Sequence, residues 1–270
     1  MAFTSHIFLF YFLPAVLLLY HAVPQRWPKI RNAILLAAGY VFYAWASPWF
    51  AGLLLVVTVV NYGLSLAVAA SDAKGLRIFW TALAVAVDLG ALAFFKYAGF
   101  VEESLNHVLS LVGRDALPVL RIALPVGISF YTFKVIGYVV DVCRRQSPPA
   151  RSLLDFACYV SFFPQLLSGP IQRFGTIDSR SDSLPTFAEQ LLGRSQRIDR
   201  FSRGVALFML GFAKKILLAN AVGQVADAVF AAASPGTSDA WYGALAYSFQ
   251  LYFDFSAYSE MAIGVGLMFG

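Results

Sequence analysis

Charged side chains are scarce in this sequence. Asp, Glu, Lys and Arg make up 13% of the 270 residues, whereas a soluble globular domain contains about 25%. Hydrophobic residues make up 59%, and the mean hydropathy is +0.69. This balance excludes an ordinary soluble domain. The apolar runs are long and continuous and do not alternate in segments of ~10 residues, so a transmembrane β-barrel is also excluded. The composition therefore predicts an all-α, polytopic transmembrane helical bundle.

Cysteine and the common cofactor-binding motifs are equally sparse. The two cysteines, Cys143 and Cys158, are too few for a disulfide framework. The sequence contains no P-loop, no dinucleotide-binding glycine motif, no HExxH zinc motif and no cluster of metal ligands. We therefore expect no bound cofactor and no metal. The first residues, MAFTSH, lack the positive charges of a cleavable signal peptide, so we expect the first apolar helix to be retained.

What the sequence does contain is a series of apolar runs. They predict membrane spans at 7–23, 32–47, 49–70, 78–98, 122–142, 216–233 and 241–259, with an eighth apolar segment beginning at 261. Lys and Arg concentrate in cytoplasmic loops. An extracytoplasmic N-terminus places sixteen of them inside and only Arg114 and Arg121 outside. We expect this orientation. The net charge of +5 then follows from topology and does not indicate a nucleic-acid partner.

The connecting regions predict three further features. Residues 101–118 are expected to form an amphipathic extracytoplasmic helix and a turn. Residues 153–168 form a short apolar run that Pro164 interrupts, so a re-entrant or interfacial segment fits better than a span. Four arginines follow at three-residue spacing, which on one helix would form a basic stripe against anionic lipid headgroups or, less favoured, a phosphorylated acyl donor. They are Arg194, Arg197, Arg200 and Arg203.

Two charged residues fall inside predicted spans at similar depth. Asp88 lies ten residues into the fourth span and Lys134 lies eight residues from the end of the fifth. A charge at mid-bilayer is costly unless it is paired or hydrated. One hypothesis is that these residues pair or share a hydrated cavity. The alternative is that each is solvated separately, with Lys134 reaching toward the interface.

Other polar residues lie beside a helix-breaking sequence or within an apolar helix. Gln165, Gln172 and Arg173 flank Gly169-Pro170, where a broken helix exposes backbone groups that can line a substrate path. Asp254 lies in the block FDFSAYSEM and is a candidate wall of an internal chamber; interhelical hydrogen bonding is the alternative. The candidate lining residues of such a chamber are Asp88, Lys134, Gln165, Gln172, Arg173 and Asp254.

Three stretches resemble a known family. They are FTSHIFLFYFLPAVLLLYHAVP, then PVGISFYTF with LLDFACYVSFFPQLLSGPIQRF, and finally FQLYFDFSAYSEMAIGVGLMFG. The sequence resembles the membrane-bound O-acyltransferase (MBOAT) family, in particular its bacterial branch that O-acetylates alginate and similar exopolysaccharides. The resemblance implies a bacterial inner-membrane enzyme that takes an acyl group from a cytoplasmic donor, acetyl-CoA or similar, to an extracytoplasmic acceptor. It also implies membrane lipids, a polysaccharide or a periplasmic acetyltransferase as partners, and no nucleic acid.

Histidine is the residue that this chemistry needs, because a base must take the proton of the acceptor hydroxyl. The chain has only His6, His21 and His107, all expected at interfaces, with Glu103 one helical turn before His107. In the family the essential histidine follows a tryptophan, and no Trp-His pair occurs here. We therefore assign no catalytic residue. We expect residues 1–270 to be a single membrane domain, the N-terminal part of a longer MBOAT domain truncated at 270, inactive by itself.

Two other functions share these sequence features. A transporter or flippase for a lipid-linked sugar also needs broken helices and buried charges. A non-catalytic scaffold of a polysaccharide-secretion complex needs only the membrane bundle.

Overall fold

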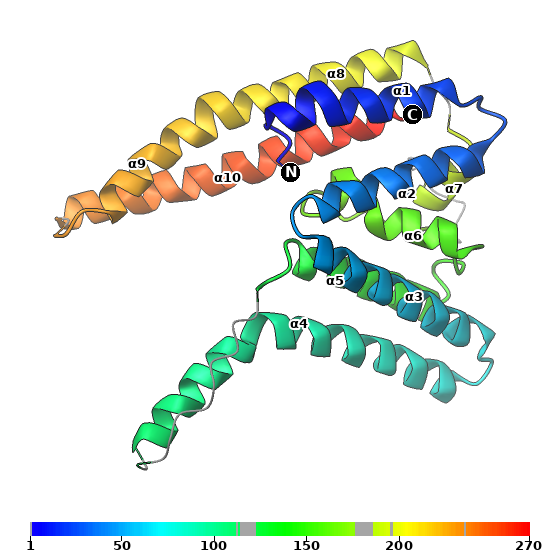
Figure 1. Cartoon of the computed structure of the whole chain (residues 1–270), viewed down its shortest axis with the longest axis horizontal. Coiled ribbons are helices and arrows are strands. Elements are labelled where there is room, and N and C mark those ends of the chain that lie inside the picture. The colour runs from blue at the N-terminus through cyan, green and yellow to red at the C-terminus, as the bar shows by residue number, and fades with distance from the viewer. Residues whose placement is uncertain (1, 112, 114–122, 176–185, 195–196, 235) are drawn as a thin grey trace. The chain divides into compact units, whose positions relative to one another are not determined.

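Every regular element in the described part of the chain is a helix, which confirms the all-α class. The computed structural model describes residues 2–111, 113, 123–175, 186–194, 197–234 and 236–270. The chain divides into two compact units (Figure 1). Unit 1 comprises Met1–Ala38, Phe162–Ile171 and Leu191–Gly270, and unit 2 comprises Gly39–Ser161 and Gln172–Gln190. That the chain is a single domain stays a prediction.

Unit 2 centres on three helices that pack against one another, with a shorter helix against the first of them. These are α3 (Pro48–Ala70), α4 (Lys74–Leu111), α5 (Ile128–Cys143) and α6 (Leu153–Ser161). The unit also takes the last residues of α2 (Pro28–Ala44) and the first of α7 (Phe187–Leu192). At 1.5 Å per residue, α6 is about 14 Å long and too short to cross a hydrocarbon core of about 30 Å. This agrees with the prediction that 153–168 is not a span.

The starts of two helices in unit 2 follow from proline and glycine. α3 begins with a proline in its first turn, Pro48, where the missing N–H costs nothing. α5 begins at Ile128 and not at 122, because Gly127 has φ +77°, a left-handed conformation that favours glycine. The predicted start of the fifth span was therefore too early, and the described residues before it, from 123, contain no helix.

Helix α4 is longer than the sequence suggested. The predicted span 78–98 lies inside it, but the helix continues to Leu111 without a break. The helix expected within 101–118 is confirmed for 101–111, but it is continuous with the span before it, and residues 112 and 114–118 lie outside the described residues. Gly99 is the only helix-weakening residue near the expected boundary, and a single glycine is tolerated in a helix interior.

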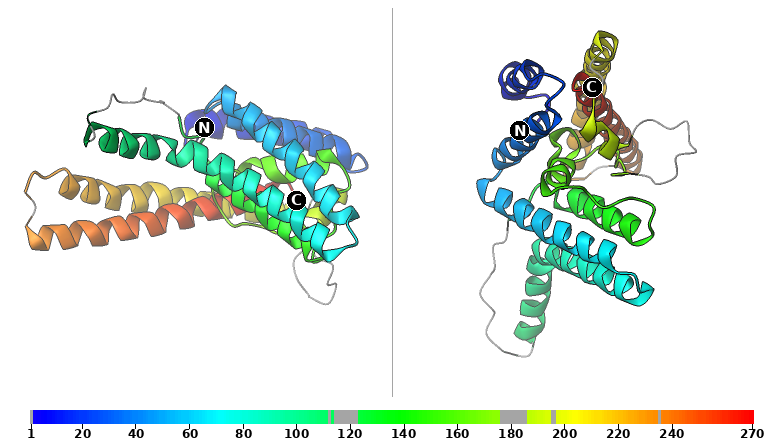
Figure 2. Two further views of the ribbon diagram at one scale, coloured as in Figure 1. Left: turned by 90° about the horizontal axis from the view of Figure 1, so that it is seen from below. Right: turned by 90° about the vertical axis from the view of Figure 1, so that its right-hand side faces the viewer.

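Unit 1 contains a long helical hairpin. Its first arm runs through α8 (Ile198–Ala213), the π-helical segment η3 (Lys214–Ala219) and α9 (Asn220–Phe230), and its second arm is α10 (Thr237–Met268). Figures 1 and 2 show the two arms side by side along their length. The unit also contains the short segments η1 (Phe8–Phe12), α1 (Leu13–Ala22) and η2 (Phe163–Gln165), and the first residues of α2. The η1–α1 segment confirms the predicted helix at 7–23.

Small residues let the two arms of the hairpin approach closely. A Cβ added at Gly204 would lie 2.6 Å from the carbonyl oxygen of Gly264, and one at Gly211 would lie 2.6 Å from that of Ala257. Close backbone contact through glycine is a common way to pack helices in a membrane, where hydrophobic burial adds little.

The hairpin corrects three expectations. The predicted span 216–233 is the second half of one 33-residue helix, Ile198–Phe230. The span 241–259 and the apolar segment from 261 are one helix, α10, because no proline or polar turn separates them. Finally, α8 begins at Ile198, so Arg194 and Arg197 precede it and the four arginines do not share a helix. Arg194 instead donates to the Tyr20 hydroxyl at 3.0 Å, and Arg200 to the carbonyl of Gly270 at 3.3 Å.

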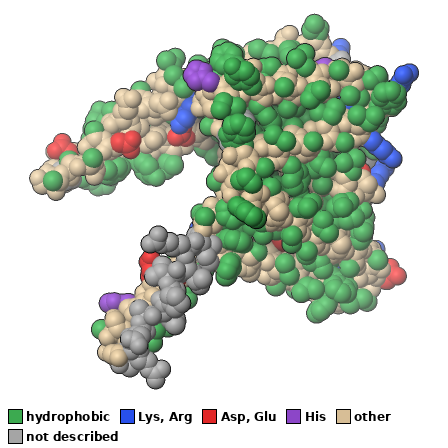
Figure 3. Space-filling view, in the orientation of Figure 1, with side chains coloured by type: hydrophobic (Ala, Val, Ile, Leu, Met, Phe, Trp, Pro, Cys, Tyr) green, Lys and Arg blue, Asp and Glu red, His purple; other side chains and the backbone are tan. Residues whose placement is uncertain are grey.

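Three helices of the described chain are long and apolar enough to cross a membrane: Pro48–Ala70, Lys74–Leu111 and Ile198–Phe230. A shorter apolar helix covers Phe8–Ala22. Apolar side chains cover much of the face seen in Figure 3, and some are nearly fully exposed, such as Trp49 at 90%. Large exposed apolar surfaces are rare on soluble monomers and are expected where lipid is the solvent. The protein is therefore an α-helical membrane protein.

Candidate functional site

A fully buried lysine lies at the centre of unit 2. Lys134 on α5 is 1% exposed, and its Nζ donates a hydrogen bond of 2.7 Å to the carbonyl oxygen of Tyr159 on α6. The same Nζ lies 4.3 Å from the centre of the Tyr159 ring and 5.9 Å from that of Phe187. A carbonyl dipole and two aromatic faces thus stabilise the ammonium group. This lysine joins α5 to α6.

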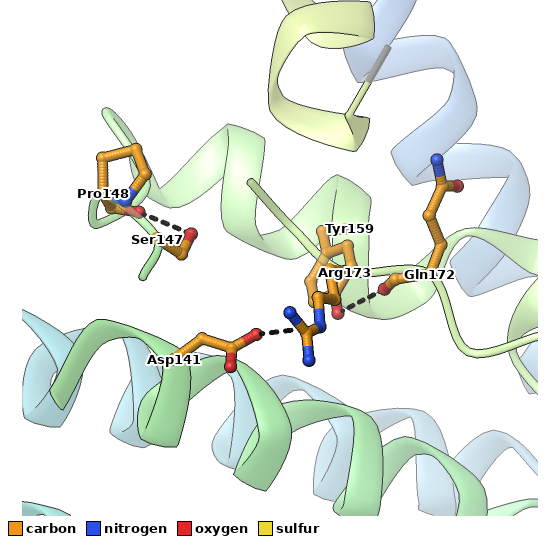
Figure 4. A network of polar contacts seen from close by, with 6 residues as sticks. All are labelled: Asp141, Ser147, Pro148, Tyr159, Gln172 and Arg173. Atoms are coloured by element: carbon orange, nitrogen blue, oxygen red, sulfur yellow. Dashed lines mark hydrogen bonds and ion pairs between the residues drawn. The ribbon is translucent and has the colours of Figure 1, made fainter. Parts of the chain in front are cut away.

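Tyr159 extends this contact to the broken region that follows α6. Its hydroxyl donates to the carbonyl oxygen of Gln172 at 2.9 Å (Figure 4). Burial raises the pKa of the Tyr159 phenol above its ordinary value, and the Asp141 carboxylate raises it further. The phenol therefore stays protonated and remains a donor. Its ring packs edge-on against Phe174 and Phe187, so the tyrosine is held on several sides.

Arg173 lies at the outer end of this chain of contacts. Its Nε is 3.9 Å from Oδ2 of Asp141 on α5, as Figure 4 shows. The arginine side chain is 73% exposed and the aspartate 14%. An ion pair with one exposed partner contributes little stability in water. The arrangement therefore leaves most of the guanidinium available to an anionic group.

Three of the predicted site residues are thus brought together, and a residue that sequence reasoning missed connects them. Lys134, Gln172 and Arg173 lie along one path through Tyr159. Gln172 takes part through its main-chain carbonyl and not its side-chain amide. The signal for Tyr159 was weak, because a single tyrosine in an apolar run is usual in membrane helices. Whether these residues line a chamber stays a prediction.

Asp88 is also buried in unit 2, but its partner is not Lys134. Its Oδ1 accepts a hydrogen bond of 2.7 Å from Nδ2 of Asn61 on α3. Lys134 is bound to Tyr159, so each residue has a partner of its own. The hypothesis that the two charges pair directly is therefore wrong. The reason is local: the side-chain amide of Asn61, on the neighbouring helix α3, binds the carboxylate. A single asparagine in an apolar helix forms no pattern from which this contact could be predicted.

Asp254 lies in unit 1 and forms an ion pair with Lys215. Lys214, the residue before Lys215 on the first arm of the hairpin, forms an ion pair with Glu260. It also donates a hydrogen bond of 3.0 Å to the Ser256 hydroxyl. Both lysines belong to the π-helical segment η3. They lie in the middle of the first hairpin arm and not in a cytoplasmic loop, so they do not support the predicted orientation. π-helical segments are rare and often mark functional sites.

Gln165 also lies in unit 1, at the end of η2. Its Oε1 is buried and has no hydrogen-bond partner among the described residues. The break that follows is confirmed, since residues 166–175 contain no helix and Gly169 has φ +115°. A Cβ on Gly169 would lie 3.6 Å from the Tyr258 ring, so this backbone packs against α10. Gln165 and Asp254 belong to unit 1, whereas Lys134 belongs to unit 2.

The three histidines lie outside these clusters. His6, His21 and His107 are all exposed, and His21 contacts the carbonyl of Met268 at 3.1 Å. Glu103 and His107, whose one-turn spacing would allow a pair, form no ion pair in the described structure. Within the described ranges, no group of three or more His, Cys, Asp and Glu side chains could hold a metal ion.

Known proteins are similar to this chain, and two of those described here match nearly its whole length. It is 45% identical to "Probable alginate O-acetylase AlgI" of Azotobacter vinelandii, over 100% of this chain and 52% of that protein. It is 31% identical to the peptidoglycan O-acetyltransferase of Helicobacter pylori, over 99% of this chain and 54% of the relative. It is 28% identical to the teichoic acid D-alanyltransferase of Streptococcus thermophilus, over 63% of this chain and 38% of the relative.

The chain spans about half the length of the first two of these curated relatives. No family model and no solved structure matches it. The full-length similarity to bacterial O-acetylating proteins agrees with the three sequence blocks, the all-α fold and the membrane helices. The chain belongs to the membrane-bound O-acyltransferase family.

Proposed function

We propose that the protein is part of an integral-membrane O-acyltransferase that acetylates hydroxyl groups of an exopolysaccharide such as alginate. The observation that carries this proposal is the 45% identity, over 100% of this chain and 52% of the relative, to a protein named "Probable alginate O-acetylase AlgI". An acetyl group is favoured over D-alanine because the D-alanyltransferase is less similar and matches only part of the chain.

In the proposed reaction the acceptor hydroxyl attacks the carbonyl carbon of an acetyl thioester, acetyl-CoA or a similar cytoplasmic donor. A C–O ester bond forms, the C–S bond breaks, and a base takes the hydroxyl proton. We do not assign the base to His6, His21 or His107. As part of the same proposal, it is a histidine outside residues 1–270, in the part of the relatives that this chain does not cover.

The proposed location is the inner membrane of a bacterium, with the N-terminus extracytoplasmic and lipid around the helices. The acceptor is a polysaccharide, reached directly or through a periplasmic acetyltransferase partner. The polar contacts that lead from the buried Lys134 to the exposed Arg173, together with the lysine–carboxylate pairs of the hairpin, support the proposal of polar groups inside the bilayer. Such groups are retained there mainly for function.

The test uses the full-length protein in a strain from which its gene has been removed. We expect restored O-acetyl esters on the secreted polymer, measured as acetate released by mild alkali. Residues 1–270 alone, inserted at the same level, should restore none. An unchanged ester content with the full-length protein correctly inserted would refute the enzymatic proposal. A transporter would instead change the amount of exported polymer, and a scaffold would keep working after the downstream histidine is replaced by alanine.

A further inference from the structure

The contact between Asn61 and Asp88 is incomplete in a specific way. Their side chains are 0% and 2% exposed, and one hydrogen bond of 2.7 Å joins Nδ2 of Asn61 to Oδ1 of Asp88. Two side-chain oxygens are left over, the amide oxygen Oδ1 of Asn61 and the second carboxyl oxygen Oδ2 of Asp88. Both are buried and have no hydrogen-bond partner among the described residues. Both free atoms are acceptors if the carboxylate is ionised.

One hydrogen atom would satisfy both of these oxygens. A carboxylic acid and a primary amide can form two hydrogen bonds at once, with the amide N–H donating to one acid oxygen and the acid O–H donating back to the amide oxygen. The first of these bonds is present. A proton on Oδ2 of Asp88 supplies the second, whereas an ionised carboxylate leaves two buried acceptors unsatisfied, which native structures avoid.

Among the residues that the structure describes, no cation forms an ion pair with the Asp88 carboxylate that would favour its ionised form. Asp88 is the fifteenth residue of the 38-residue helix α4 and Asn61 the fourteenth of the 23-residue helix α3, so both are far from the helix ends. The nearest cation on α5, Lys134, is bound to Tyr159. The titratable group of α5 that interacts with the Asp88 carboxylate is the Tyr131 phenol, which is itself fully buried and adds no positive charge.

We infer that Asp88 is a proton-binding site inside the membrane: it holds a proton on Oδ2, donates it to Oδ1 of Asn61, and is uncharged at neutral pH. The ligand is a single proton, taken up from solvent by the carboxylate. The resulting pair joins α3 to α4 with two hydrogen bonds and buries no net charge. The inference does not depend on the proposed acyltransferase function, because it concerns α3 and α4 alone.

Infrared spectroscopy of the full-length protein in lipid vesicles tests this directly. At pH 8, where exposed carboxyl groups are ionised, we expect the wild type to show the carbonyl stretch of a protonated carboxylic acid. The band should shift in deuterium oxide and vanish in Asp88→Asn, which keeps both hydrogen bonds as an amide–amide pair and should fold. Asp254→Asn is the matched control, because it removes a carboxylate paired with Lys215 and should leave the acid band unchanged.

A wild-type spectrum without the acid band, or a band that survives in Asp88→Asn, would overturn the inference. A second measurement tests the inference even if the Asp88→Asn protein does not insert into the membrane. In the wild type labelled with carbon-13 at the aspartate carboxyl groups, the acid band should move to the frequency of the heavier carbon. A band that does not move would assign the proton to a glutamate and refute the site.

Discussion

The ammonium group of Lys134 donates a 2.7 Å hydrogen bond to the main-chain carbonyl of Tyr159 and lies 4.3 Å from the centre of the same residue's ring. One residue thus stabilises the charge in two ways, through a dipole and through a π face. Among the described residues the lysine has no ion-pair partner. The contact therefore engages the buried amino group of Lys134 without a carboxylate beside it.

The burial of Lys134 predicts its chemical reactivity. In the folded protein we expect no reaction with a membrane-permeant amine reagent, because its side chain is 1% exposed and its Nζ is engaged. Lys74, which is exposed at the start of α4, should react fully and serves as the control. Peptide mass spectrometry before and after unfolding measures both. Labelling of Lys134 at the rate of Lys74 in the folded state would contradict the structure.

Replacement of Tyr159 by phenylalanine removes only the hydroxyl that donates to Gln172. The ring stays and continues to contact Lys134. A partly buried carbonyl loses its donor, so Tyr159→Phe should lower the free energy of unfolding by about 1 kcal/mol. Thermal unfolding of the detergent-solubilised protein measures the change. Tyr242→Phe, at a tyrosine that is 62% exposed, is the control and should unfold at the wild-type temperature.

The ion pair between Lys215 and Asp254 predicts coupled effects of mutation. Lys215→Met or Asp254→Asn alone leaves the other group charged and unpaired in an apolar helical hairpin. Each should cost on the order of 1 kcal/mol, since both side chains are about one third exposed. The double variant should recover part of that loss. Asp227→Asn, at an exposed residue of α9, is the comparison. If the stability losses of the two single variants add up to the loss of the double variant, the ion pair contributes nothing to stability.

Close packing of the hairpin makes Gly211 sensitive to a methyl group. A Cβ there would lie 2.6 Å from the carbonyl oxygen of Ala257, so Gly211→Ala forces the two arms apart and should cost about 1–3 kcal/mol. Gly266 on the opposite arm has nothing within 4 Å of such a Cβ. Gly266→Ala should therefore be neutral or slightly stabilising, because alanine is the better helix former. Equal unfolding temperatures for the two variants would refute this packing.

Sequence patterns predicted the elements that depend on local composition. The run at 49–70 became α3 within one residue, because Pro48 and Ser71 bound it on both sides. Helix ends without such residues were misplaced: α4 continues past 98, and α10 joins two predicted segments. Hydropathy sets where a helix is apolar but not where it stops, and a helix that leaves the apolar layer stays a helix when nothing breaks it.

Partners of the polar residues could not be predicted at all. Depth along two helices suggested that Asp88 and Lys134 meet, but depth does not say which faces of the helices point toward each other. The actual partners are an amide 27 positions away and a main-chain carbonyl 25 positions away. A main-chain carbonyl leaves no trace in the sequence, and an isolated Asn61 is one polar residue among several.

The two lysine–carboxylate pairs of the hairpin also fix how its arms can move. Lys214 and Lys215 engage residues six positions apart on α10, while Gly204 and Gly211 leave no gap between the backbones. Sliding one arm by a helical turn, about 5.4 Å, would break both pairs at once and press side chains into the opposite backbone. We therefore expect the two arms to keep a fixed register. The hairpin can tilt as one rigid body, but its arms cannot slide past each other.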